Sequence, residues 1–288
     1  MGATHVRALG PSLVAAVVEP SDEAAKRTGI ERRYRNVDEL LTAGGVDGAI
    51  VAAPTRFHST VVGQLLDAGL PVLCEKPCGL TSDETRALER RAAEAGVPLH
   101  VGYWRRFVPA LRELQAQLAS GALGELELVA CAQWDERPPP AAFRDPASSG
   151  GIVVDMGVHE FDELRWLTGQ EIVSVTGVAS EAAVNGDPDG VALALALAGG
   201  TTALVSLLRR HPPGDLCRVE IVGTKNVARL DFLAPDDGER VFLDALRAQA
   251  ADFASSIAGQ PSAGATPDDA ARALEVAERA RATLSVAR

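Results

Sequence analysis

Residues 48–77 read GAIVAAPTRFHSTVVGQLLDAGLPVLCEKP, and this stretch decides the fold class. It begins with an apolar run, Gly48–Ala53, that is stopped by a proline, and it ends with a second such run, Val72–Glu75. Between them, Phe57–Ala68 has a helical pattern that a glycine ends. A strand, a helix and a strand of these lengths predict a βαβ unit with parallel strands.

The same alternation continues on both sides of this unit. The other elements predicted for this half are a strand over Leu13–Val18, helices over Ala3–Leu9, Ser21–Thr28, Asp38–Ala43 and Ser82–Ala95, and a strand over Leu99–Tyr103. Asp38 is placed to cap its helix, and residues near Ser82 and Thr85 are placed to cap the last one. We therefore predict a Rossmann-type, doubly wound parallel sheet for residues 1–101.

After residue 101 the pattern changes to strand after strand. The predicted elements are helices over Pro109–Ala119 and from Gly150-Gly151 to Leu167, strands over Leu126–Trp134, Ile172–Val178, Val191–Leu197, Thr202–Leu208, Cys217–Val222 and Val227–Phe232, and helices over Val241–Ala258 and Pro267–Ser285. Residues 102–288 are thus predicted to form a second α/β domain with a mostly antiparallel, open sheet.

Charge and composition exclude several classes of protein. The formal net charge is −11, which argues against nucleic-acid and anionic-membrane partners because both favour an excess of Lys and Arg. The apolar run 191–208 is long enough to span a membrane, but its period of two and the Gly199-Gly200 break predict a β-hairpin. The four cysteines form no C-x-x-C pair, which favours reduced thiols in a cytoplasmic protein.

The first residues resemble the end of a dinucleotide-binding loop. Gly2 precedes a predicted helix, and the following strand ends in Glu19, an acidic residue at the distance from the glycines where it would bond ribose hydroxyls. If Gly2 is the third glycine of G-x-G-x-x-G, the first strand and two glycines lie upstream of residue 1. The alternative is that Gly2 is an ordinary residue at a start codon. On the first interpretation, we expect this chain to bind dinucleotide poorly or not at all.

Two further motifs follow predicted strands at the carboxyl edge of the parallel sheet, where ligands bind in open α/β folds. Glu75-Lys76-Pro77 places at this edge a lysine that can donate to the oxygen of a carbon undergoing hydride transfer. Pro54, Thr55 and His58 follow the preceding strand and would line the nicotinamide side. The alternatives are a surface lysine and an ordinary turn.

A third motif lies in the second domain. Asp155, His159 and Asp162 are spaced i, i+4 and i+7, which is one face of a helix. Histidine suits proton removal from an alcohol near neutral pH, and a carboxylate can orient it. A solvated polar face is the alternative interpretation, and a metal site is disfavoured because no further His or Cys is near.

Together these motifs resemble the glucose-fructose oxidoreductase / inositol dehydrogenase / rhizopine-catabolism (Gfo/Idh/MocA) family. The resemblance covers essentially the whole chain and adds the segments 53–58, 102–107, 150–151 and 166–169; residues 155–169 look most like the inositol 2-dehydrogenase branch. It implies a catalytic set of Lys76, Asp155 and His159, with His159 as general acid/base, Lys76 hydrogen-bonded to the reacting oxygen and Asp155 supporting the pair.

The resemblance also implies ligands and partners. Arg106 matches a family position near the substrate, and Asp135 and Asp162 are weaker candidates for hydroxyl contacts. Gly2, Glu19, Pro54, Thr55, His58 and Glu75 are the expected cofactor contacts, with no metal. Glu19 favours NAD over NADP because a carboxylate repels a 2′-phosphate. The open sheet implies a homo-oligomer, a dimer or tetramer.

The function expected on these grounds is hydride transfer between NAD and a ring hydroxyl of a cyclitol or sugar. A non-catalytic protein that senses dinucleotide or sugar on the same fold is a second hypothesis, because fold alone does not determine function. An inactive, truncated form is a third.

Overall fold

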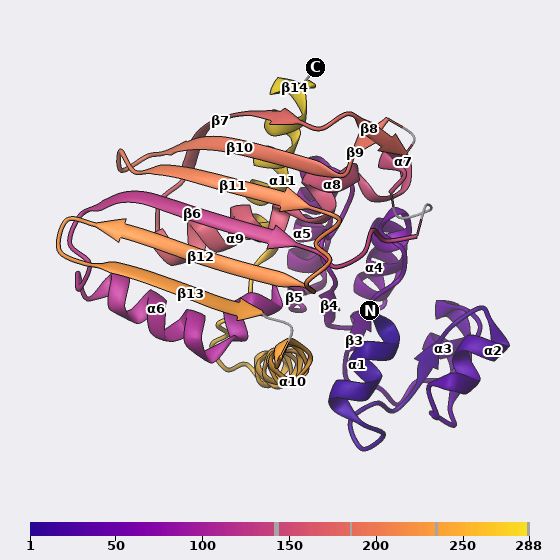
Figure 1. The fold of residues 1–288 in the computed structure, drawn as a ribbon. Coiled ribbons are helices and arrows are strands. Elements are labelled where there is room, and N and C mark those ends of the chain that lie inside the picture. The colour runs from indigo at the N-terminus through magenta and orange to yellow at the C-terminus, as the bar shows by residue number, and fades with distance from the viewer. Residues whose placement is uncertain (141–143, 185, 234–235, 287–288) are drawn as a thin grey trace.

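The computed structural model describes residues 1–140, 144–184, 186–233 and 236–286. Short parallel strands with helices make up the first half of the chain, and a large mixed sheet makes up the second (Figure 1). This is the predicted combination of a Rossmann-type half and an α/β half with a mostly antiparallel sheet, so the predicted fold class is confirmed.

The first half contains five helices and five strands. The helices are α1 (Gly2–Leu9), α2 (Asp22–Arg27), α3 (Val37–Ala43), α4 (His58–Asp67) and α5 (Ser82–Ala95), with a 3₁₀ turn, η1 (Thr55–Phe57), before α4. The strands are β1 (Val17–Val18), β2 (Arg33–Tyr34), β3 (Ala49–Val51), β4 (Val72–Cys74) and β5 (Leu99–Val101). β3, β4 and β5 pair in parallel, so the βαβ prediction for residues 48–77 is confirmed.

Three local predictions for this half are corrected. The strand predicted over Leu13–Val18 is only Val17–Val18, because residues 11–13 form a turn. Asp38 does not cap α3: the Asn36 side chain accepts from the Glu39 N–H at 2.9 Å. Thr81 caps α5, one residue before the predicted region. In both helices the cap is the last residue with an extended backbone, which the pattern of apolar residues does not locate.

The parallel strands form a pair and a triplet. β1 pairs with β2, β3 pairs with β4, and within the described residues no strand joins β1 to β3. In this part of the chain, one edge of β1 and one edge of β3 therefore pair with no strand.

The second half is built on a seven-stranded sheet in the order β13-β12-β6-β11-β10-β7-β14. These strands are β6 (Leu126–Trp134), β7 (Ile172–Ala179), β10 (Gly190–Leu197), β11 (Thr202–Leu208), β12 (Leu216–Gly223), β13 (Val227–Leu233) and β14 (Leu284–Val286). β6–β11 and β7–β14 are parallel and the other pairs are antiparallel. The 191–208 hairpin is confirmed as β10–β11, and β14 was not predicted.

Helices cover one face of this sheet and leave the other open (Figure 1). They are α6 (Pro109–Ala119), α9 (Gly157–Thr168) and α11 (Pro267–Thr283). Leu193 and Leu195 are buried toward these helices, whereas Ala192 and Ala194, which alternate with them, are exposed on the other face. The remaining elements of this half are η2 (Trp104–Phe107), α7 (Pro146–Ser149), α8 (Gly151–Asp155), β8 (Ala182–Val184), β9 (Asp187–Pro188) and α10 (Gly238–Ile257).

The two C-terminal helices return to the first half. α10 packs on α1, and α11 lies between α5 and α9. The Val101 N–H donates to the Ala265 carbonyl at 3.0 Å, just before α11 begins. The predicted boundary between residues 101 and 102 therefore marks the change of sheet, while contacts of the C-terminal helices cross it.

Candidate active site

Lys76 follows β4 at the carboxyl edge of the parallel triplet, as the motif predicted. Its Nζ donates to the backbone carbonyl of Asp155 at 2.6 Å and to Oδ1 of the same residue at 3.2 Å. The Lys76 side chain is 17% exposed, so its ammonium is largely withdrawn from water but still reachable. The contact joins the first half of the chain to the second across 79 residues.

Asp155 is available for this contact because the helix breaks there. The single helix predicted from Gly150 to Leu167 is α8 and α9 in the structure, separated at Met156. The His159 N–H donates to the Met156 carbonyl at 3.1 Å instead of to Asp155. The Asp155 carbonyl is thus left without its helical partner, and the lysine ammonium satisfies it.

His159 is buried in the first turn of α9, close enough to Lys76 for the charge of the ammonium to act on the imidazole. Burial, then the positive charges of Lys76 and Arg105, hold the pKa of His159 well below its usual value. The imidazole is therefore neutral near pH 7, and its Nδ1 has no hydrogen-bond partner among the described residues. Tyr103 and Trp104 contact the ring edge-on, with centroid distances of 5.8 and 6.4 Å. A neutral, buried imidazole is suited to accept a proton.

Asp135 follows β6 and faces the same site. Burial raises its pKa to about 6, and a hydrogen bond from Gln133 acts in the opposite direction. Asp155 and Lys76 also act on this carboxyl, raising and lowering its pKa respectively. The structure therefore brings together Lys76, Asp155, His159 and Asp135 from four separate segments.

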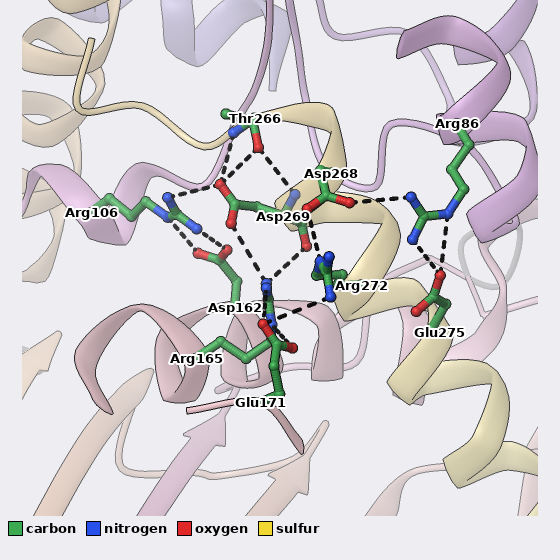
Figure 2. A network of polar contacts seen from close by, with 10 residues as sticks. All are labelled: Arg86, Arg106, Asp162, Arg165, Glu171, Thr266, Asp268, Asp269, Arg272 and Glu275. Atoms are coloured by element: carbon green, nitrogen blue, oxygen red, sulfur yellow. Dashed lines mark hydrogen bonds and ion pairs between the residues drawn. The ribbon is translucent and has the colours of Figure 1, made fainter. Parts of the chain in front are cut away.

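Arg106 and Asp162 pair with each other, and their expected contact with substrate stays a prediction. The Arg106 guanidinium donates to both Asp162 oxygens, at 2.9 and 2.5 Å, and pairs with Asp269 of α11 at 3.2 Å (Figure 2). Both side chains are buried. Because α9 starts only at residue 157 and Asp162 faces α11, the i, i+4, i+7 spacing does not put this carboxylate beside His159 and Lys76. The pair fastens η2 and α9 to α11.

A second buried cluster, centred on Arg105, was not predicted from the sequence. Arg105 donates to Glu160 at 2.6 Å, to Glu163 at 3.0 Å and to Gln133 at 2.8 Å. Burial raises the pKa of Glu163 to about 8 despite the Arg105 charge. Cys131, Glu160 and Glu163 have the spacing of a metal site, but the Arg105 guanidinium already occupies the carboxylates and would repel a cation. The available signal was Glu160 and Glu163, two carboxylates on a helix in which apolar residues make up the rest of the same face.

The expected cofactor contacts divide into two groups. Gly2, Glu19, Pro54 and Thr55 lie at strand ends or at the start of α1 with part of their surface accessible. His58 and Glu75 are buried and engaged: His58 contacts the carbonyls of Ala53 and Pro77, and Glu75 contacts His5. Their side chains thus have partners within the protein, and their assignment as cofactor contacts stays a prediction.

The first group fits a dinucleotide. α1 begins at Gly2, where a side chain would approach only Ala52, so backbone N–H groups at this helix end are accessible to an anion. Glu19 lies at the end of β1 beside a hollow of about 330 Å³ that Arg33 and Tyr34 also line. The carboxylate can accept hydrogen bonds from the ribose hydroxyls, and the N–H groups of the helix end can donate to a pyrophosphate.

The fold and this site define a two-domain, NAD-dependent oxidoreductase. Residues 4–103 match the model of an oxidoreductase family with an NAD-binding Rossmann fold, and residues 111–229 match the GFO/IDH/MocA C-terminal domain. The chain belongs to the Gfo/Idh/MocA family.

The sequences and structures of individual relatives support this family assignment. The chain is 46% identical to the rhizopine catabolism protein MocA of Rhizobium meliloti, over 99% of this chain and 92% of the relative. It is 36% identical to the myo-inositol dehydrogenase Hyg17 of Streptomyces leeuwenhoekii, over 99% and 95%. A putative myo-inositol dehydrogenase structure from Sinorhizobium meliloti superposes with a TM-score of 0.89 at 27% identity, over 98% and 93% of the two chains.

One similar structure with bound cofactor is that of GenD2 from gentamicin A biosynthesis, solved in complex with NAD. It superposes with a TM-score of 0.90 at 25% identity and covers 98% of this chain and 90% of that structure. Among the described residues, no helix is both long enough and apolar enough to cross a bilayer.

Proposed function

We propose that the protein oxidises a ring hydroxyl of a cyclitol or sugar, in the manner of an inositol 2-dehydrogenase, with NAD as hydride acceptor. The contact of Lys76 with Asp155 beside a neutral His159 is the observation that carries this proposal. The names of the relatives support the substrate class, since Hyg17 is a myo-inositol dehydrogenase and MocA acts in rhizopine catabolism.

Each member of the set has one task in this proposal. His159 accepts the hydroxyl proton, because its lowered pKa keeps the imidazole neutral and ready as a base. Lys76 donates a hydrogen bond to the reacting oxygen and stabilises the negative charge that develops as the proton leaves. Asp155 holds the ammonium at 2.6 Å. NAD, when bound, supplies the hydride-accepting ring, and Glu19, the start of α1, Pro54 and Thr55 would hold it.

Substrate recognition in this proposal falls to Asp135. Its carboxyl lies close enough to Lys76 and Asp155 for their charges to change its pKa. An ionised carboxylate accepts hydrogen bonds from the hydroxyls of a polyol. Glu19 at the ribose end favours NAD over NADP because a second negative charge there would be repelled. A non-catalytic sensor on this fold needs neither the base nor the ammonium, so the assembled set disfavours that alternative.

Formation of NADH in the presence of single inositols and aldoses tests the proposal. At saturating NAD we expect turnover of at least one cyclitol or sugar, and His159→Ala should reduce kcat by about 10²–10⁴-fold because a general base is removed. Lys76→Ala should also reduce kcat by orders of magnitude. His100→Asn is the control, since His100 packs on Phe253 away from the site. Absence of turnover across the panel, or near-normal kcat in either alanine variant, would contradict the proposal.

We further propose that the open face of the large sheet joins copies of the chain into a dimer or tetramer. Val178, Leu204 and Val227 are exposed on the strands of this sheet, and alanines on β10 lie between them. Exposed apolar side chains gathered on one sheet face are typical of a self-associating interface. The four buried, unpaired cysteines also support a reducing, cytoplasmic location for this chain.

A further inference from the structure

The tripeptide Glu75-Lys76-Pro77 is held on both sides by buried histidines from two different helices. We propose that His5 of α1 and His58 of α4 are positioning residues that fix this tripeptide and thereby aim the Lys76 ammonium at Asp155. The catalytic consequence rests on the proposed function, whereas the mechanical claim can be tested without turnover.

His5 fixes the residue before the lysine. Its Nε2 lies 2.6 Å from Glu75 Oε1, and each residue is only 4% exposed. With the carboxylate as acceptor, the ring donates through Nε2–H. Gly102 closes the other side: a Cβ at this position would lie 3.0 Å from Glu75 Oε2 and 3.1 Å from the Glu75 Cα. The Glu75 side chain therefore has one place to lie, between α1 and the end of β5.

His58 fixes the residue after the lysine. Its Nδ1 lies 2.7 Å from the Pro77 carbonyl oxygen, and its Nε2 lies 2.7 Å from the Ala53 carbonyl oxygen. Both partners are carbonyl oxygens, so a ring nitrogen that carries hydrogen donates to the loop that it faces. Since His58 is 1% exposed, these contacts do not compete with water. The ring thus ties the loop after β4 to the loop after β3.

These two anchors matter because a free lysine is a flexible group. Ordering its side chain costs about 2 kcal/mol of rotamer entropy, and the loop that carries it would add to that cost. Holding the backbone before and after Lys76 leaves only the side-chain torsions to be ordered by Asp155. α1 also carries the helix end proposed to face the pyrophosphate, so one helix aligns the cofactor with the lysine.

Amine labelling decides the mechanical claim. The chain has three lysines, and Lys26 and Lys225 are exposed, so they serve as internal references for Lys76. Trace acetylation with acetic anhydride, read by mass spectrometry, measures the labelling of each. We expect the ratio of Lys76 to Lys225 labelling to rise several-fold in His5→Ala and in His58→Ala. Arg7→Ala is the matched control, because it removes the contact of α1 with Glu239 on another side of the helix.

An unchanged Lys76 ratio in folded His5→Ala and His58→Ala would overturn the proposal, and so would an equal rise in Arg7→Ala. If His5→Ala does not fold, His5→Gln takes its place: the Gln amide can still donate to Glu75, so its ratio should lie close to that of the unchanged protein, whereas His5→Leu should show the rise. These outcomes do not depend on whether any polyol is oxidised, so failure of the proposed function remains distinguishable.

A double-mutant cycle tests the catalytic consequence. We expect His5→Ala to reduce kcat by on the order of tenfold to a hundredfold, as misplacement of a catalytic group does, with little change in KM for NAD. In a Lys76→Ala background the same change should cost almost nothing, because His5 acts through Lys76. His5→Gln should restore much of the lost kcat. Equal losses in both backgrounds would show that His5 acts by another route.

Discussion

At the scale of single residues, burial determines the acid–base properties of the site. The pKa of His159 is lowered and that of Asp135 is raised, in both cases first of all by removal from water. Both shifts favour the uncharged form of the group. The neutral histidine can act as a base well below pH 6.5, so the ionisation of Asp135 is the event expected to shape substrate binding in weakly acidic solution.

Substitution of Asp135 by Asn tests this expectation. The carboxyl is ionised above its pKa of about 6 and protonated below it, so KM for the polyol should rise as the pH falls through about 6. Asp135→Asn should raise KM about tenfold at neutral pH, the value of one hydrogen bond to a charged group, and should remove the pH dependence. KM measured from pH 5 to pH 8 in both proteins checks this. A pH dependence that persists in the Asn variant would contradict the assignment.

At the scale of elements, the N-terminus of α11 fastens three parts of the chain. Asp269 completes the capping box with Thr266, pairs with Arg106 of η2 at 3.2 Å and lies near Arg165 of α9 (Figure 2). The neighbouring Asp268 instead pairs with Arg86 of α5 and Arg272, at the edge of the same network. Adjacent residues of one type thus have different surroundings.

The two aspartates should therefore differ in their effect on stability. Asp269→Ala should reduce the free energy of unfolding by about 2 kcal/mol, because it removes a helix cap and one partner of the buried Arg106. Asp268→Ala should cost about 0–1 kcal/mol, since the side chains of its ion pairs are 32–42% exposed and water screens them. Urea denaturation followed by circular dichroism measures both. Equal losses would mean that the buried part of the network contributes nothing beyond its exposed rim.

At the scale of the whole molecule, the sheet has one covered and one open face (Figure 1). Leu204 lies on the open face, 49% exposed, on β11 in the inner part of the sheet. Leu204→Arg should convert the proposed oligomer to a monomer, because a charge in an apolar interface is costly to bury. Light scattering after size-exclusion chromatography measures the mass. Leu13→Arg is the control for charge, because Leu13 is 72% exposed in the turn after α1 and does not belong to the large sheet. An unchanged mass for the Leu204 variant would place the interface elsewhere.

The sequence by itself predicted most of the elements and the residues of the proposed reaction centre. Apolar runs stopped by proline or glycine are local signals, so β3, β4, α4 and the β10–β11 hairpin could be predicted. Lys76 was predictable because a lysine after a parallel strand must lie at the carboxyl edge of the sheet. Asp155 and His159 were identified by spacing and by family resemblance, and the structure brings them to the same place as Lys76.

Only the tertiary structure decided the partners of the charged side chains. Arg106, Asp162, His58 and Glu75 looked like ligand contacts in the sequence, and each is paired inside the protein. Most of these partners are distant in sequence: Pro77 lies 19 residues from His58, Asp162 lies 56 from Arg106, and His5 lies 70 from Glu75. A local sequence pattern indicates the conformation of its own segment. Which charged side chain of another helix lies beside a residue, and at what distance, depends on how the elements pack. That packing is a property of the whole chain.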